Sequence, residues 1–166
     1  MSIALYGRTG AGKTTLARYL EQTYGYSYCS TGAACRQVCR ILFDSESKTL
    51  MNRVTDALKQ MDEDVWLNAA LRSVDPMAEI VFDSMRFERD YRFFRERAFA
   101  LWRIEAPLPV RLARLGLRRQ EYDPAVDEKH RAESELDVFP FDLVIVNDSN
   151  DISQLRRTVD AALLRS

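Results

Sequence analysis

The stretch Gly7-Arg8-Thr9-Gly10-Ala11-Gly12-Lys13-Thr14 decides the fold of this 166-residue chain. It fits the pattern G-x-x-x-x-G-K-[ST], in which glycines let backbone N–H groups approach an anion with no Cβ in the way. The lysine neutralises β- and γ-phosphate charge, the Thr14 hydroxyl can ligate Mg²⁺, and Thr15 supports the loop. The pattern predicts that residues 7–15 bind the phosphates of ATP. A dinucleotide-binding loop is excluded, because its third glycine would fall where Thr15 stands.

The surroundings of this loop match the motif. An apolar strand is predicted directly before it, at Ser2–Tyr6, and a helix directly after it, at Lys13–Tyr24. Such a helix points the positive end of its dipole at bound phosphates.

Strands and helices are predicted to alternate along the rest of the chain. The further strands are Tyr26–Cys29, Glu79–Asp83, Phe99–Glu105 and Leu143–Asn147. The further helices are Gly32–Phe43, Lys48–Met61, Glu63–Val74, Arg89–Arg97, Pro109–Gln120 and Asp151–Leu164. Residues 121–137 are polar and charged. This order predicts one α/β domain over residues 1–166, with a parallel five-stranded sheet flanked by helices.

A carboxylate follows one of these strands. The segment EIVFD, residues 79–83, is predicted to be a buried strand that ends at Asp83. A carboxylate at the end of a neighbouring strand holds Mg²⁺ or its water in proteins with such a loop. Asp83 and Thr14 are therefore the predicted magnesium site. If the phosphoryl acceptor were a hydroxyl, Asp83 would be the candidate base.

Composition excludes several classes of protein. The chain has 24 basic and 25 acidic residues, a formal net charge of −1, which argues against a nucleic-acid or membrane binder held by bulk electrostatics. No run approaches the ~20 apolar residues of a membrane span, and the start has no basic segment typical of a signal peptide. The three cysteines cannot all pair. We expect a cytoplasmic protein, either a monomer or a homodimer.

Arginine is distributed unevenly. The chain has 20 arginines and four lysines, and ten of the arginines lie from residue 86 to residue 119, beside only four acidic residues. Residues 121–151 instead carry ten acidic residues against Lys129 and Arg131. Arginine prefers planar, bidentate partners such as phosphate. The pattern favours a small phosphorylated ligand over a nucleic-acid-processing ATPase, which would need a basic face. Nucleic acid stays open only as an acceptor.

Ser30-Thr31-Gly32, followed by Arg36, resembles the start of the monophosphate-binding helix in adenylate kinase-like enzymes of the P-loop NTPase fold. The resemblance implies that Thr31 and Gly32 lie against the acceptor nucleoside and that Arg36 grips its phosphate. Arg40, one turn later, points the same way. It also implies a helical acceptor-binding region at about residues 32–74.

Phe82-Asp83-Ser84-Met85-Arg86-Phe87 resembles the Asp-x-Arg-Phe signature of phage-type deoxynucleoside monophosphate kinases, with one extra residue between Asp83 and Arg86. The resemblance makes Arg86 a second ligand of the acceptor phosphate. Asp64-Val65-Trp66-Leu67 resembles the helix before this strand and implies that Trp66 packs near the acceptor base. A purely core role is the alternative for Trp66.

Residues 111–119 resemble the helix that enters the lid of nucleotide kinases. Arg111, Arg114 and Arg118 recur at helical spacing, and the resemblance implies that Arg114 and Arg118 stabilise the transferring phosphoryl group. His130-Arg131-Ala132-Glu133-Ser134-Glu135 resembles the His-x-x-Glu-x-Glu stretch that follows the lid in phage-type enzymes. The lid is expected at about residues 115–135, and its candidate residues are Arg111, Arg119, His130 and Arg131. The resemblance implies that His130 and Arg131 reach phosphate from the lid.

Val144-Ile145-Val146-Asn147-Asp148 resembles the last strand of dephospho-coenzyme A kinases and their relatives. The loop beyond that strand lies by the donor adenine, so Asn147 and Asp148 are candidate ATP ligands.

The function expected from these resemblances is Mg²⁺-dependent phosphoryl transfer from ATP to a (deoxy)nucleoside monophosphate. One alternative is a P-loop kinase of a hydroxyl, in dephospho-coenzyme A, another small metabolite or a modified base in DNA. The other is an ATP-binding regulatory module without kinase activity. The absence of an Asn-Lys-x-Asp motif argues against a GTPase.

Overall fold

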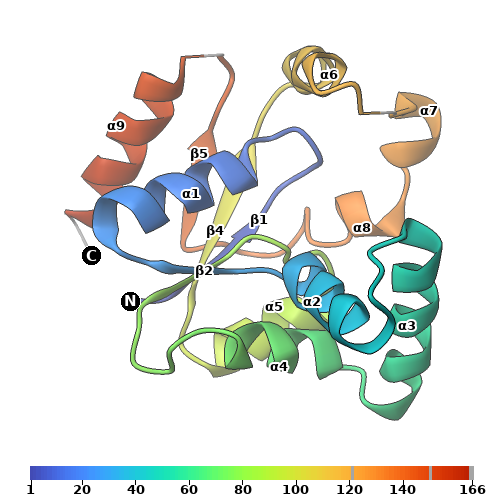
Figure 1. Cartoon of the computed structure of the whole chain (residues 1–166). Coiled ribbons are helices and arrows are strands. Elements are labelled where there is room, and N and C mark those ends of the chain that lie inside the picture. The colour runs from blue at the N-terminus through green and yellow to red at the C-terminus, as the bar shows by residue number, and fades with distance from the viewer. Residues whose placement is uncertain (121, 150, 165–166) are drawn as a thin grey trace.

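A five-stranded parallel sheet forms the centre of the computed structural model, which describes residues 1–120, 122–149 and 151–164 (Figure 1). Its strands are β1 (Ile3–Tyr6), β2 (Ser27–Cys29), β3 (Ile80–Phe82), β4 (Ala100–Glu105) and β5 (Leu143–Val146). They lie in the order β2-β3-β1-β4-β5. The predicted fold class is confirmed.

The register of the sheet places the functional segments. In β1, Ala4 lies opposite Phe82 of β3, and Tyr6 lies opposite Arg103 of β4. Because all pairs are parallel, the residues that follow β1 and β3 emerge side by side at one edge of the sheet. Ligands of open α/β sheets bind at this edge.

Helices cover both faces of the sheet. Ile3 and Leu5 point to the face covered by α1 (Lys13–Tyr24) and α9 (Ile152–Leu163). Ala4 and Tyr6 point to the opposite face, which is covered by α2, α3, α4 and α5. Those helices span Thr31–Phe43, Lys48–Met61, Val65–Arg72 and Glu88–Glu96. The bounds of α1 and α3 are those predicted, and the others agree within about one turn.

Three further helices lie beyond the carboxyl ends of the strands (Figure 1). They are α6 (Leu108–Leu117), α7 (Pro124–Asp127) and α8 (Arg131–Ser134). The last two fall in the charged region for which the sequence predicted no helix. Each is one turn long and is started by a side-chain cap, because Asp123 accepts from the N–H of Ala125 and His130 accepts from that of Ala132.

Two further sequence expectations concern the cysteines and a membrane-spanning helix. Cys29, Cys35 and Cys39 are free and buried. Among the described residues, no helix has the length and apolar character that a membrane span requires.

Candidate phosphate-binding site

The loop between β1 and α1 depends on glycine at its closest approach to the last strand. Gly12 has a φ of 113°, and a Cβ built there would lie 2.5 Å from Nδ2 of Asn147. An L side chain at this position would therefore meet both backbone strain and a clash. The predicted use of glycine in the motif is reflected in this geometry.

Side-chain donors hold the carbonyl oxygens of the loop. Arg111 Nη1 donates to the carbonyl of Thr9 at 3.2 Å, and Arg114 Nη1 donates to those of Gly10 and Ala11, both at 3.2 Å. Buried Asn147 donates from Nδ2 to the same Ala11 carbonyl at 2.7 Å. These donors fix the loop without competing for its N–H groups, which are the groups that bind anions.

The carboxylate of Asp83 lies directly beside the loop. Its Oδ2 accepts hydrogen bonds from the Thr14 hydroxyl at 2.8 Å and the Tyr28 hydroxyl at 3.0 Å, while Ser84 donates to Oδ1 at 3.0 Å. Oxygen ligands of this kind suit Mg²⁺. The residues present therefore fit a magnesium ion, which Thr14 and Asp83 would hold. Tyr28 is a neighbour of this pair that the sequence prediction missed.

A cleft of about 220 Å³ opens beside these groups. Arg86 and Arg118 both line it, together with the loop and Asp83. The residues that line it are Thr9, Gly10, Gly12, Lys13, Thr14, Thr15, Asp83, Ser84, Arg86, Arg118 and Gln120. The structure thus brings together the predicted donor loop, the predicted magnesium ligands and two predicted arginines.

Lys13 points back into the loop. Its Nζ donates to the carbonyls of Gly7 and Arg8. Burial lowers the pKa of Lys13, and with the smaller effect of the positive charge of Arg86 and the opposing effects of Glu133 and Asp83 the pKa is about 8. An added anion would favour the protonated form.

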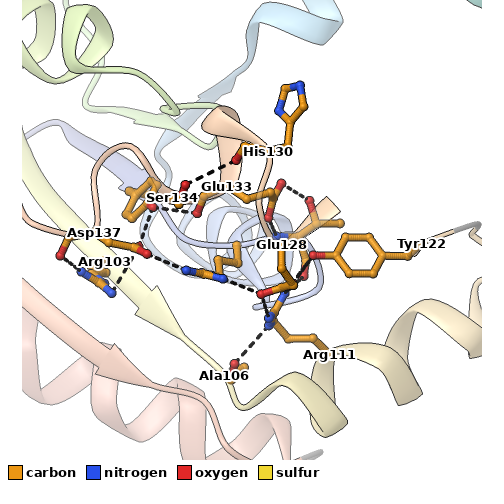
Figure 2. Close-up of polar contacts among 12 residues, drawn as sticks. Arg103, Ala106, Arg111, Tyr122, Glu128, His130, Glu133, Ser134 and Asp137 are labelled. Atoms are coloured by element: carbon orange, nitrogen blue, oxygen red, sulfur yellow. Dashed lines mark hydrogen bonds and ion pairs between the residues drawn. The ribbon is translucent and has the colours of Figure 1, made fainter. Parts of the chain in front are cut away.

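The charged segment between α6 and β5 supplies three carboxylates to the loop (Figure 2). Glu133 accepts hydrogen bonds from both N and Oγ1 of Thr9, each at 2.6 Å. Glu128 pairs with the buried Arg111 at 2.7 Å. Asp137 pairs with Arg8 at 2.6 Å. The sequence prediction missed all three as site residues.

Other predicted ATP and lid residues occupy different places. Arg111 and Arg114 contact the carbonyl side of the loop, so their geometry fits holding the loop instead of contacting a transferred group. Asn147 is likewise a loop contact, and Asp148 is exposed. Arg119 is exposed and has a positive φ of 53° just beyond α6.

The helix α8 directs its basic side chains away from the loop. The His130 ring caps α8 and points away from the carboxylates that contact the loop (Figure 2). Arg131 pairs with Glu135 on the surface and lies over the ring of Phe87, at 5.7 Å from its centroid. Neither side chain joins the predicted phosphate site in this conformation.

The predicted acceptor residues of the helical region lie on α2, at the surface or in the core. Thr31, Gly32 and Arg36 lie on the first turns of α2, where Arg36 is exposed. Arg40 pairs with Glu46 at the surface. Trp66 is 4 % exposed and lies within the hydrophobic core, which is the alternative placement considered for it.

A parallel sheet with a phosphate-binding loop after its first strand is the arrangement of P-loop proteins, and comparison with known proteins shows the family. The chain belongs to the AAA domain family, whose model matches residues 3–135. It is 35 % identical over 74 residues to a cytidylate kinase of Rhodopseudomonas palustris (strain BisB18), which is 44 % of this chain. The match spans only 35 % of the length of that enzyme.

Solved structures share the fold across nearly the whole chain. Shikimate kinase from Acinetobacter baumannii, in complex with shikimate, matches with a TM-score of 0.61 at 17 % identity. The match covers 99 % of this chain and 93 % of the shikimate kinase chain. TT1252 from Thermus thermophilus has a TM-score of 0.59 at 20 % identity, with 99 % and 97 % covered. The matches support nucleotide kinase-like proteins as a group and do not single out the phage-type enzymes.

Proposed function

We propose that this chain transfers a phosphoryl group from ATP to the phosphate of a (deoxy)nucleoside monophosphate, with Mg²⁺ as cofactor. One observation carries the proposal: the loop, the Thr14–Asp83 pair and two arginines from separate elements, Arg86 and Arg118, line the same cleft. A binding module needs the first two of these features, whereas a transferase also needs cations for a developing charge.

Each group has a proposed task. The loop and Lys13 bind the donor phosphates, and Thr14 and Asp83 hold Mg²⁺, which neutralises charge on the donor phosphates. Arg118 stabilises charge on the transferred group. Arg111, Arg114 and Asn147, which contact the loop carbonyls, keep the loop in shape.

The acceptor is proposed to bind between the cleft and the helical region of residues 32–74. Arg86 and Arg36 would hold its phosphate, and Thr31 with Gly32 would contact the nucleoside. An ionised phosphate needs no general base, which suits a chain with a single histidine. The lid would be formed by residues 115–135. The partial match to a cytidylate kinase supports a nucleotide acceptor.

A hydroxyl acceptor is the second candidate, and one contact favours it. Arg86 donates to Glu133 at 3.2 Å, so part of its charge is neutralised within the chain. A less positive cleft suits an uncharged hydroxyl better than a second phosphate, and Asp83 would then serve as the base.

ADP release measured with ATP, Mg²⁺ and a panel of acceptors distinguishes these functions. The panel contains the nucleoside and deoxynucleoside monophosphates, dephospho-coenzyme A and DNA. A monophosphate that stimulates release supports the proposal, and stimulation only by hydroxyl acceptors supports the second candidate. ADP release that no acceptor stimulates would indicate an ATP-binding regulatory module.

Variants test the assignment of residues. Lys13→Ala should abolish turnover while the protein still folds. Arg36→Ala and Arg86→Ala should mainly raise the acceptor KM, and the matched control Arg92→Ala, an exposed arginine on α5, should leave it unchanged. Unchanged acceptor KM and kcat in both test variants would place the acceptor elsewhere.

A further inference from the structure

We propose that Glu133 is a built-in competitor of phosphate at the loop, and that ATP binds only when the segment of residues 129–135 that carries α8 moves away. This inference rests on the proposed ATP site but not on the identity of the acceptor. It concerns a carboxylate that the proposed reaction does not use.

Both oxygens of the Glu133 carboxylate are occupied by the site. Oε2 accepts from the backbone N–H of Thr9 at 2.6 Å. Oε1 accepts from the Thr9 hydroxyl at 2.6 Å and from Arg86 at 3.2 Å. The side chain is 7 % exposed, so these contacts form away from bulk water. Backbone N–H, hydroxyl and guanidinium donors together are the set that a phosphate group would use.

Two anions cannot use these donors at once. Thr9 and Arg86 line the cleft with Lys13, so an anion in the cleft lies among the same positive groups. A carboxylate held beside an incoming phosphate would add like-charge repulsion in a poorly solvated place. Binding of ATP therefore favours a conformation in which Glu133 has left the loop.

The segment is anchored at both ends, and between them its backbone is held to the core by the Tyr6 hydroxyl, which donates to the Glu133 carbonyl at 3.0 Å. Before it, Glu128 pairs with the buried Arg111. After it, Leu136 is fully buried in the core. Between these anchors α8 is a single turn, and apart from Glu133 its residues are partly or fully exposed. A segment with few buried apolar contacts opens at low cost in free energy.

Arg8 would keep a partner after such a movement. It pairs with Glu128 and also with Asp137, which follows the anchor at Leu136 in the sequence. The contacts that need to break are those of the Glu133 carboxylate with Thr9 and Arg86, the hydrogen bond from the Tyr6 hydroxyl to the Glu133 carbonyl at 3.0 Å, and the pairs of Glu135. In this proposal the pairs of Arg8 stay in place while the Glu133 carboxylate moves.

Hydrogen exchange and ATP titration of the whole chain test this proposal, with Mg²⁺ present and no acceptor. Adding ATP should raise amide exchange in residues 129–135 while lowering it in residues 9–14. Glu133→Gln should bind ATP more tightly by on the order of tenfold, because it removes a charged competitor from the donors. The control Glu96→Gln removes an exposed charge at the end of α5 and should match the wild type.

The outcomes are separable. ATP binding that leaves exchange in residues 129–135 unchanged or lowers it would overturn the proposal, even if Glu133→Gln binds more tightly through charge alone. Weaker binding by Glu133→Gln would also overturn it and make Glu133 a support of the loop. Failure of both proteins to bind ATP would overturn this proposal and the proposed function together. Movement of the segment without transfer to any acceptor would support this proposal and refute only the kinase activity.

Discussion

The protonation state of Lys13 should make ATP binding depend on pH in a range where few other groups titrate. Burial lowers the pKa of this lysine to about 8 in the free protein. Bound phosphates favour the ammonium form and raise that pKa, so ATP binding takes up a proton when the pH exceeds about 8. Arg86 and Arg111 face the ammonium group as like charges, and Glu133 and Asp83 face it as opposite charges.

The magnitude follows from the fraction of free protein that carries the proton. With a pKa of about 8, that fraction is about three quarters at pH 7.5 and about one tenth at pH 9.0, so the ATP affinity should fall about eightfold. Titration calorimetry in two buffers of different ionisation enthalpy should show uptake of about three quarters of a proton per ATP at pH 8.5.

Lys13→Arg provides the control, because a guanidinium stays protonated throughout this range. Whatever its absolute value, the ATP affinity of this variant should be nearly independent of pH between pH 7.5 and 9.0. A flat profile in the wild type, or an equal slope in Lys13→Arg, would refute the assignment of the proton to this lysine.

Three further predictions concern the frame of the site. Gly12→Ala should abolish ATP binding and lower the free energy of unfolding by about 1–3 kcal/mol; Gly25→Ala, at a φ of 74° with nothing within 4 Å of its Cβ, should cost about 1 kcal/mol in a urea titration and keep ATP binding. Hydrogen bonding to Arg111 lowers the pKa of Glu128 to about 2, so the contribution of Glu128 to the free energy of unfolding is present above about pH 4.5 and is lost toward pH 2. Glu128→Gln should therefore lower the free energy of unfolding by about 3 kcal/mol at pH 7 and by little near pH 2. An equal loss at both pH values would contradict this. Thr14→Ala should lower kcat on the order of 100-fold at saturating Mg²⁺, whereas Thr14→Ser should stay near the wild type; equal rates in the two variants would remove Thr14 from the magnesium site.

The sequence predicted the fold well because its signals are local. The loop motif, the apolar strands and the helical periodicity each lie within a few residues, and the alternation of elements leaves a parallel sheet as the consistent arrangement. The same locality found Asp83, since a carboxylate at a strand end is a short pattern. Its partner in space, Tyr28, lies in a strand far from it in sequence and carried no such pattern.

The predicted roles of charged residues were harder to obtain. Arg111 and Arg118 belong to the same helically spaced, arginine-rich stretch of sequence. Arg111 is nevertheless buried behind the loop, whereas Arg118 lines the cleft. Helical spacing gives the face of a helix but not what covers it. The acidic stretch containing Glu133 was visible beside the arginine-rich one, and the opposite charges were a signal that the two would meet. Which carboxylate would reach which arginine depends on the tertiary fold.

The contact between Asn147 and the loop has a consequence for how the chain matures. Ala11 is synthesised 136 residues before Asn147, whose amide donates to the Ala11 carbonyl from just after β5. A nascent chain without β5 would therefore carry the loop motif without one of the side chains that hold its carbonyl groups. A nucleotide stabilises a protein only to the extent that it binds the folded form more tightly than the unfolded form. Stabilisation by ATP should thus increase when β5 joins the sheet.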